Sequence, residues 1–416
     1  MDTSTKVLLL SSVYHGGLAI TRSLGRLGVA VYVADADPWA PSLFSKYCRG
    51  RFIWDLNRAP AEDSLAFLTT IGRTLGRHTI LIPTADTTAL FVAANADALQ
   101  EWFLFPQVPL DLTQSLCSKK KMYFLARSVG VATPNTFFPA SRQDVLAFAE
   151  DARFPIMLKA IENRRAKNPA ARKKVIVRGK QQLLDHYEIM EDPQHPNLML
   201  QEYIPGGEDA NWMFDGYFGE NSECLFGLTG QKIRQYRPSV GITSLGVCQP
   251  NATVVETTKA FMKAIRYRGI LDIGYRYDVR DGLFKVFDVN PRIGCTFRLF
   301  VSDNGMDVAR ALYLDLTGQP VVAGHDLPGR KWMAEDIDLA SSYYYWRNGK
   351  LTVTEWLRSF RGLQESSFFA PDDLHPMLSI CLCDFRHLFR RLRKKERTTP
   401  MTGAFQSKLT KIKTDS

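Results

Sequence analysis

The sequence has no long hydrophobic run, although 45% of its residues are hydrophobic. None of its apolar stretches approaches the ~18–20 residues that are needed to cross a bilayer. The first apolar stretch, residues 7–10, is too short and too quickly interrupted to serve as a signal peptide. These absences argue against an integral membrane protein, and we expect a cytoplasmic one.

The sequence also lacks the cysteine spacing of a disulfide framework or a zinc site. The seven cysteines are odd in number and scattered, and the one close pair, Cys381 and Cys383, lacks zinc-site spacing. This usage argues against a disulfide-stapled scaffold and fits reduced cysteines in a cytosolic protein. The sequence also shows no Ser/His/Asp or Cys/His pattern that would indicate a covalent nucleophile.

Positive charge is in excess, but it is concentrated at one end of the chain. The formal net charge is +10. From Arg386 onward there are ten Lys and Arg residues against Glu396 and Asp415, so this tail carries +8 and the body is nearly neutral. The charge therefore gives no reason to expect nucleic-acid binding by the body.

The basic tail itself allows two interpretations. Leu388, Phe389 and Leu392 recur at helical spacing among cations, as in a helix that lies on an anionic membrane. A helix docked on the body with a solvated basic face has the same pattern. Residues 398–416 lack the apolar content to pack, and we expect them to be disordered.

The length of 416 residues predicts two or three domains. A buried-type strand at 7–11, a helix at 18–27 and a strand at 29–34 form a βαβ unit of the doubly wound type, although the full dinucleotide glycine fingerprint is missing. We therefore place a small α/β domain at 1–110. A mixed region of strands follows at 111–320, and an aromatic-rich segment at 321–397 predicts packed helices.

The most informative motif is the run at 284–292, which predicts a short strand that ends at a proline. Side chains two apart on a strand point to the same face, so Asp288 and Asn290 project together, with Arg292 just beyond the strand. A carboxylate and an amide oxygen suit a hard cation such as Mg²⁺, which commonly shares its ligands with phosphates. An arginine close by can bind a phosphate through two nitrogens.

Three further motifs precede this run in the sequence. They are Ser118–Lys119, a lysine at the end of the apolar strand 156–159, and the segment from Gln201 to Glu208. In this order the four motifs resemble the ATP-grasp superfamily, and the resemblance covers roughly residues 1–320. Those enzymes activate a carboxylate as an acyl phosphate and usually join it to an amine.

The resemblance implies a fold and a set of ligands. The fold would be an α/β class with an N-terminal Rossmann-like (pre-ATP-grasp) domain, an ATP-grasp α+β domain and a mostly helical C-terminal extension. The cofactors would be ATP and Mg²⁺ or Mn²⁺. The partners would be a small carboxylic acid and an amine, such as an amino acid.

By the same resemblance, specific residues would hold the nucleotide. Lys159 and Lys119 would hold the α- and β-phosphates, although Lys120 and Lys121 are adjacent to Lys119 and could replace it. Glu208 would hold the ribose hydroxyls. The hinge that reads the adenine edge would comprise Gln201, Glu202, Tyr203 and Ile204.

The sequence departs from the family pattern in two places. The segment at 162–174, where the family has a glycine-rich lid, contains no glycine. Either its basic side chains replace the missing backbone contacts or it is a plain basic loop. The strand before Asp288 places Gly274 where the family has a metal ligand, so we expect Asp272, on the same strand face, to supply it. We expect Asp278 to cap the turn.

Several basic residues could stabilise the negative charge of an acyl phosphate and its adduct. Arg292, Arg234 and Arg298 are the candidate catalytic residues, and Lys232 is a candidate for the phosphates. Arg237 extends the same basic cluster.

We interpret the chain as an ATP- and Mg²⁺-dependent carboxylate–amine (or carboxylate–thiol) ligase of undetermined oligomeric state. One alternative is a small-molecule kinase without an amine acceptor, which would release a phosphorylated product. Another is a nucleotide-binding oxidoreductase or sensor that uses the first domain. His15, Gly16 and Gly17 are its only support, and nicotinamide binding without ATP binding would favour it.

Overall fold

The computed structural model describes residues 1–10, 14–162, 165–166, 168–171, 174–236, 238 and 241–381. The predicted interfacial helix and disordered tail lie outside these residues. The chain begins with a five-stranded parallel sheet of order β3-β2-β1-β4-β5. Its strands are β1 (Val7–Leu10), β2 (Val31–Asp35), β3 (Cys48–Ile53), β4 (Thr79–Pro83) and β5 (Phe103–Leu104).

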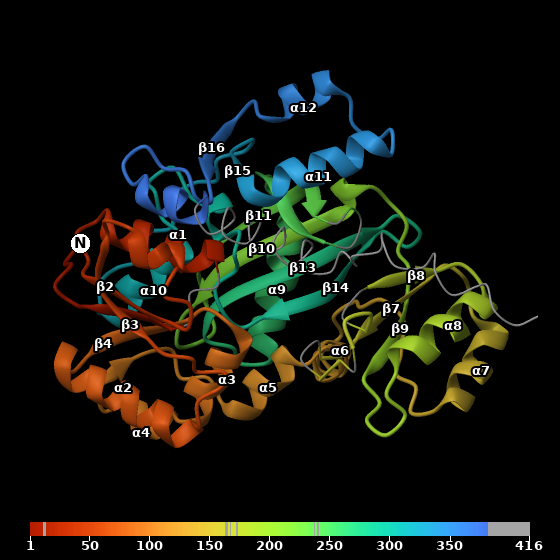
Figure 1. Ribbon diagram of the computed structural model, residues 1–416, viewed down its shortest axis with the longest axis horizontal. Helices are drawn as coiled ribbons and strands as arrows, with labels where there is room; N and C mark the ends of the chain where they lie inside the picture. Colours follow the sequence, from red (N-terminus) through yellow and green to blue (C-terminus); the bar gives the residue numbers. More distant parts are fainter. Residues whose placement is uncertain are drawn as a thin grey trace, which may run out of the picture.

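Helices cover both faces of this sheet, as the buried strand β1 requires. Val7 and Leu9 pack towards α1 (Tyr14–Gly25), whereas Leu8 and Leu10 pack towards α2 (Ala61–Leu75). Figure 1 shows the two helices on opposite sides of the sheet. The remaining helices of this part are η1 (Pro41–Phe44), α3 (Asp86–Ala94) and α4 (Ala96–Leu99). The predicted doubly wound unit is confirmed.

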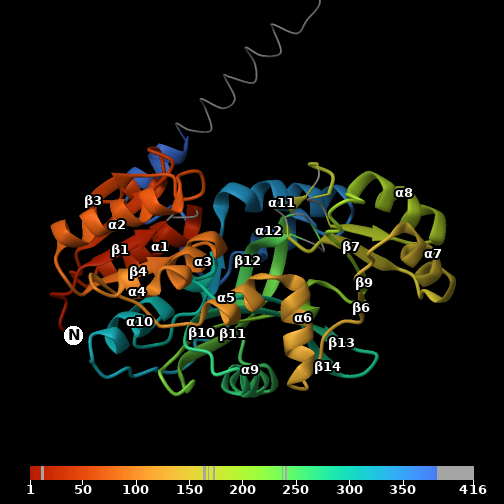
Figure 2. The ribbon, with the colours of Figure 1, turned by 90° about the horizontal axis from the view of Figure 1, so that it is seen from below.

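Two helices, α5 (Leu110–Cys117) and α6 (Lys119–Ser128), lead to a four-stranded antiparallel sheet of order β6-β9-β7-β8. Its strands are β6 (Thr136–Phe137), β7 (Ile156–Ala160), β8 (Val175–Val177) and β9 (Leu198–Glu202). The helices α7 (Arg142–Asp151) and α8 (Lys180–Met190) share an apolar core with these strands. Figure 2 shows the two smaller sheets at opposite ends of the molecule, with α5 and α6 between them.

The centre of the molecule is a seven-stranded sheet of order β14-β13-β10-β11-β12-β15-β16. Its strands are β10 (Asn211–Phe218), β11 (Cys224–Tyr236), β12 (Ile242–Cys248), β13 (Gly269–Asp278), β14 (Leu283–Asn290), β15 (Lys331–Met333) and β16 (Leu363–Ser366). Helix α9 (Ala252–Ala264) packs on one face, and α10 (Val308–Leu316) and α1 pack on the other. The short turns η3 (Glu208–Ala210) and η4 (Phe297–Leu299) flank the sheet.

The C-terminal segment is helical, as predicted, in α11 (Glu335–Arg347) and α12 (Val353–Ser359). It also adds β15 and β16 to the edge of the central sheet, which its sequence did not indicate. The α/β class is confirmed. One apolar core joins the first sheet to the central sheet, for example Val7 and Ile20 to Tyr217. The boundaries near residues 110 and 320 remain predictions.

Among the described residues, no helix is long and apolar enough to cross a membrane.

Candidate nucleotide and metal site

The metal motif lies on a β-hairpin formed by β13 and β14. The turn closes because the N–H groups of Asp281 and Gly282 donate to the Asp278 carbonyl, and Gly282 adopts a φ of 73° that favours glycine. The Asp278 carboxylate binds Lys285 and Arg280, so it stabilises the turn, as expected. The ladder pairs Gly274 with Asp288 and Asp272 with Asn290, as inferred from the sequence.

The structure brings three of the predicted residues into direct contact. The Asn290 side-chain amide donates to the Asp272 carboxylate at 3.2 Å. Arg292 in turn donates to the Asn290 side-chain oxygen at 3.1 Å and lies 3.9 Å from Asp272. It also donates to Asp86, at the start of α3, at 2.8 Å. Arg292 therefore joins the metal motif to the first sheet's domain.

Burial raises the pKa of Asp272 to about 6, although Arg292 opposes this by favouring the charged form. A nearby cation would stabilise the charged form of such a carboxylate. Asp272 also packs closely on Gly294, where a Cβ atom would come within 2.7 Å of its carboxylate. The glycine therefore keeps the carboxylate in place and leaves no room for a larger residue.

A carboxylate that the sequence analysis missed lies beside Asp272. Asp215 on β10 pairs with Asp272 in the ladder and is completely buried. Within the part of the chain that the structure describes, neither of its carboxylate oxygens has a hydrogen-bond partner. Burial, followed by repulsion from Asp272, raises the pKa of Asp215 well above its usual value. The sequence does contain one indication of this residue, because Asp215 is the single charged residue in the apolar run 213–218.

Lysines gather opposite Asp288. Lys159 ends the buried strand β7 and is 4% exposed, while Lys119 at the start of α6 donates to the Ile161 carbonyl at 3.2 Å. Lys174, which the sequence analysis did not single out, is exposed and interacts electrostatically with Lys159 and Asp288. No hydrogen bond or ion pair to the Lys159 ammonium forms among the described residues.

These cations are held close enough to disfavour one another's charge. Burial lowers the pKa of Lys159 to about 7, and Lys174 and Lys119 add to the effect against Asp288. Burial, followed by the repulsion of Lys174, lowers the pKa of Lys232 to about 8. Because these cations repel one another, a bound polyphosphate would stabilise their charged forms.

Their contacts distinguish the adjacent lysines at 119–121 from one another. Lys119 faces β7, whereas Lys120 is exposed, with its ammonium 5.4 Å from the Phe138 ring centre. Lys119 is therefore the member of the triplet that the structure places beside Lys159.

The predicted adenine hinge follows β9. Gln201 is buried and donates to Thr136 at 3.0 Å. The Glu202 carboxylate binds Lys285 and Arg280, so it belongs to the hairpin turn. The N–H of Tyr203 donates to the Pro155 carbonyl. The N–H of Ile204 has no partner within the described chain, which leaves a backbone donor for an adenine nitrogen.

Glu208, the predicted ribose ligand, lies at the start of η3 and is oriented by neighbouring side chains. Tyr345 on α11 donates to its carboxylate at 2.5 Å, and Gln235 on β11 also donates to it. Burial and this hydrogen bond raise the pKa of Tyr345, so it stays a donor. The C-terminal extension thus contacts the predicted ribose ligand, which no sequence motif indicated.

The three predicted catalytic arginines require a correction. Arg234 is buried and donates to Asp338 on α11 at 2.9 and 2.7 Å, and to Ser359 at 2.6 Å. Arg298 binds Glu365 through two bonds of 2.8 Å and also binds Asp307. All three nitrogens of each guanidinium are engaged. Neither arginine therefore has a free fork for a phosphate. The guanidinium of Arg292 is engaged in the same way, by Asp86, the Ile293 carbonyl and the Asn290 side-chain oxygen.

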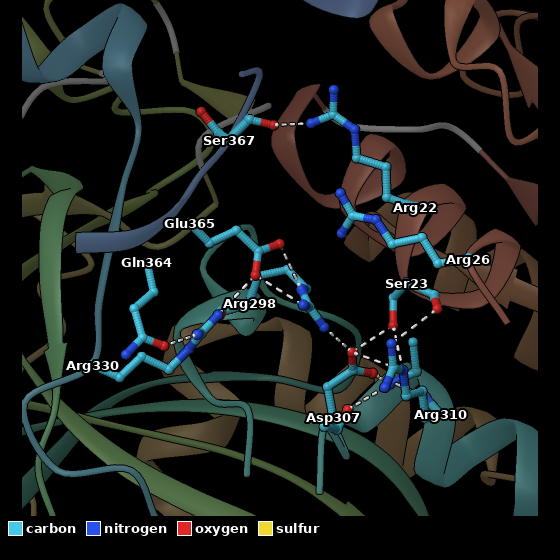
Figure 3. A network of polar contacts seen from close by, with 12 residues as sticks. Arg22, Ser23, Arg26, Arg298, Asp307, Arg310, Arg330, Gln364, Glu365 and Ser367 are labelled. Carbon is cyan, nitrogen blue, oxygen red and sulfur yellow. Dashed lines mark hydrogen bonds and ion pairs between the residues drawn. The ribbon is translucent and has the colours of Figure 1, made fainter. Parts of the chain in front are cut away.

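Figure 3 shows where Arg298 lies instead. Its charge is matched inside a buried network that joins η4 and α10 to β16, with Arg310 and Arg330 as further members. The sequence contains no indication that Glu365 would bind Arg298.

Part of the predicted site lies outside the described residues. Arg237 is among them, as are residues 163–164, 167 and 172–173 of the glycine-free lid segment.

A cluster that the sequence did not indicate lies between the three parts of the chain. His15 on α1 is 3.2 Å from the Asp336 carboxylate on α11. Burial lowers the pKa of His15, but hydrogen bonds with Asp336 and Cys295 outweigh it and raise the pKa to about 9. The imidazolium therefore links α1 to α11.

The donor set fits a hard divalent cation. Asp288 and Asp272 offer carboxylate oxygens, and Asn290 offers a side-chain oxygen that accepts from Arg292 in this structure. The unpartnered carboxylate of Asp215 lies next to Asp272 in the ladder. The described residues contain no group of three His, Cys, Asp or Glu side chains able to hold a metal by themselves. A Mg²⁺ ion here would therefore need further oxygens from a nucleotide, as Mg²⁺ sites commonly do.

Comparison with known proteins gives a consistent fold. No protein-family model matches the chain. It is 24% identical over 286 residues to a D-aspartate ligase of Enterococcus faecium (strain Aus0004), covering 66% of this chain and 68% of that protein.

Solved structures extend the likeness. An L-amino acid ligase from Bacillus licheniformis aligns with a TM-score of 0.60 and 15% identity, over 80% of this chain and 79% of that one. An N5-carboxyaminoimidazole synthetase from Staphylococcus aureus, complexed with ADP, aligns with a TM-score of 0.62 and 12% identity, over 82% and 85% of the chains. The predicted resemblance is thereby confirmed at the level of the fold: the chain has an ATP-grasp fold like that of carboxylate–amine ligases.

Proposed function

We propose that the chain is a ligase that uses ATP and Mg²⁺ to join a small carboxylic acid to an amine, through an acyl phosphate, with release of ADP and phosphate. The observation that carries the proposal is the convergence of Lys119, Lys159 and Lys232 on a strand that presents Asp288 and Asn290. Amino-acid ligases among the similar proteins support an amino acid as one substrate.

In this proposal the lysines bind and orient the polyphosphate. Lys159 and Lys119 neutralise the α- and β-phosphates, while Lys232 faces the terminal phosphate and Arg292 orients the Asn290 side chain. Glu208, held by Tyr345, accepts the ribose hydroxyls, and the Ile204 N–H donates to the adenine. Asp288, Asn290 and Asp272 would hold a Mg²⁺ ion, which when bound neutralises the charge of the phosphate oxygens.

The reaction then needs no protein nucleophile. A carboxylate oxygen of the substrate attacks the γ-phosphorus, and the bond to the ADP oxygen breaks. The neutral amine attacks the carbonyl carbon of the acyl phosphate, phosphate leaves with the bonding electron pair, and the proton lost from the nitrogen goes to the departing phosphate. The residues contribute positioning and a positive electrostatic field, which are the main sources of catalysis in phosphoryl transfer.

The first experiment is a phosphate-release screen with ATP, Mg²⁺ and a matrix of amino acids and small carboxylic acids. Once the acid is known, hydroxylamine should replace the amine and trap a hydroxamate, with ADP as the nucleotide product. ADP without hydroxamate would favour a kinase. AMP and pyrophosphate would point to an acyl adenylate and contradict the proposal.

A pair of variants on the hairpin tests the metal assignment. Asp288→Ala should lower turnover at least about 100-fold, because a metal ligand supplies several kcal/mol of charge stabilisation. Asp281→Ala is the matched control, because this carboxylate lies at the exposed turn and binds Lys285. Both should keep the wild-type circular dichroism. Turnover of Asp288→Ala within about threefold of wild type, a barrier change below ~0.7 kcal/mol, would reject the assignment.

A further inference from the structure

Helices α11 and α12 form an apolar groove on the surface. It lies on the face of α11 opposite the one that contacts Glu208. Figure 1 shows both helices on one side of the central sheet, with α12 outermost. The groove encloses about 240 Å³. Its lining is almost wholly apolar or aromatic and comprises Leu339, Tyr343, Trp346, Leu351, Val353 and Trp356, with Ser342 and Thr352.

The groove is part of a wider exposed apolar face. Five of its large side chains are well exposed, from 52% for Tyr343 to 69% for Leu339, with Trp346, Val353 and Leu357 between these values. Leu351 and Trp356 of the lining are half-buried. The opposite face of α11 is buried, since Asp338 binds Arg234 and Tyr345 binds Glu208. The outward aromatic residues are therefore not needed to pack α11 on the sheet.

Positive charge lies next to this face. The segment 339–361 carries four cations, Arg347, Lys350, Arg358 and Arg361, and all four are exposed. Its one acid, Glu355, accepts from the backbone and side chain of Thr352 in the cap of α12. The face thus combines Trp and Tyr rings with a net charge of +3, from four cations and one acid.

We propose that this aromatic groove and its cations form a docking surface for an anionic lipid bilayer. Trp and Tyr rings have an apolar body and a polar tip, which suits the interface between headgroups and acyl chains. Lysine and arginine next to such a face attract anionic headgroups. The groove would take acyl-chain segments while the four cations contact lipid phosphates.

The charge also argues against a second copy of the chain as the occupant. A two-fold interface would place the same face on both subunits. The four exposed cations would then meet their own equivalents, without an uncommitted acid to offset them. An anionic surface has the complementary charge. The basic tail, which is outside the described residues, adds +8 to the same protein in sequence terms.

The test is co-sedimentation of the full chain with vesicles of phosphatidylcholine, with or without 30 mol% (about a third) phosphatidylglycerol. The wild type should sediment with the anionic vesicles and lose binding as salt is raised. Leu339→Ser with Trp346→Ser should weaken the affinity at least about tenfold, because both apolar contacts are lost. Arg347→Glu with Arg358→Glu should weaken it at least about 25-fold, at about fivefold for each cation.

Matched controls change the same chemistry elsewhere. Val279→Ser removes an apolar side chain that is 71% exposed at the β13–β14 turn. Arg58→Glu with Arg153→Glu removes two exposed cations far from α12 in sequence. These variants should bind the anionic vesicles with the wild-type affinity or, for the charge change, within about threefold of it.

Four results would overturn the proposal. The first is no sedimentation of the wild type, and the second is equal binding to neutral vesicles. The third is wild-type affinity of the groove variant, which would assign any binding to the tail alone. The fourth is a concentration-dependent dimer, seen by light scattering, that the groove variant abolishes, since a second copy would then be the occupant.

Discussion

Individual side chains in the proposed nucleotide site lie where their charged forms are disfavoured. Lys159 is buried beside Lys119 and Lys174, with Asp288 as the nearby carboxylate that favours its charge. Such like-charge clusters persist where a ligand of opposite charge repays them. The disfavoured charges are therefore an expected property of a polyphosphate site.

Lys159→Ala should weaken ATP binding about 10- to 100-fold, because it removes a charge-assisted contact from a buried position. Lys120→Ala is the control, since Lys120 is exposed and stacks near Phe138. Titration calorimetry with a non-hydrolysable ATP analogue measures both affinities. Equal affinities for the two variants would contradict the assignment of Lys159.

At this scale, sequence reasoning succeeded where the pattern was local. The two-residue spacing of Asp288 and Asn290 and the ladder position of Asp272 follow from strand geometry alone. It failed for Arg234 and Arg298, because their partners Asp338 and Glu365 come from distant segments. A buried arginine pairs with whichever carboxylate the fold brings to it, and one sequence does not contain that information.

At the scale of elements, α11 connects the C-terminal extension to the proposed nucleotide site. Tyr345 orients Glu208, whose carboxylate also accepts from Gln235. A carboxylate fixed by two donors loses less rotational freedom when it binds a ribose.

Tyr345→Phe should therefore raise the KM for ATP about three- to tenfold and leave kcat within about twofold, since one hydrogen bond to a charged group is lost. Tyr344→Phe on the same helix is the control, because the Tyr344 ring is exposed and lies tilted by 49° beside the Tyr236 ring, with 6.2 Å between the ring centres. Steady-state kinetics over a range of ATP concentrations separates the two parameters. An unchanged KM in Tyr345→Phe would argue against the role of Glu208.

The contact between α1 and α11 predicts a pH dependence of stability. The pKa of His15 is raised from 6.5 to about 9 in the folded state. Its contribution, up to about 3 kcal/mol, is full below the unfolded pKa and disappears as pH rises through about 9.

We expect the Tm to fall between pH 6.5 and 9.5 through loss of this contribution. His15→Gln should lower the Tm at pH 6.5 and flatten the fall, whereas His195→Gln, at an exposed loop position, should leave both unchanged. Differential scanning fluorimetry across the pH range measures these differences. The same slope in His15→Gln as in wild type would show that another group causes it.

For the whole molecule, the sequence predicted the buried strands better than the short strands that pair at the edge of a sheet. Buried runs such as 7–10 carry their own signal. The strands β15 and β16 are short, and they form because the edge of β12 is available to them. Such pairing depends on tertiary context, so a segment rich in aromatic residues was read as helical throughout.

The same context ties the end of the described chain to its beginning. Arg22 on α1 donates to the Asp373 carboxylate at 2.9 Å and to the Phe368 carbonyl at 2.7 Å, and both ionic side chains are buried. Figure 3 shows the related bond from Arg22 to Ser367. Ser45 also donates to Asp373. The extension is thus held on α1 by a buried ion pair.

Asp373→Ala should lower the free energy of unfolding by about 3–5 kcal/mol, because it leaves the Arg22 charge buried without a counter-ion. Asp372→Ala is a control one residue away: its ion pair with Arg26 is 39% and 28% exposed on the two side chains, so we expect a loss below about 1 kcal/mol. Urea unfolding followed by fluorescence gives both values.

The double variant Arg22→Met with Asp373→Leu should recover much of the loss, since it removes both charges together. If the double variant were as unstable as Asp373→Ala, the loss would come from the hydrogen bonds to Ser45 and the backbone, and the buried charge would not be its cause.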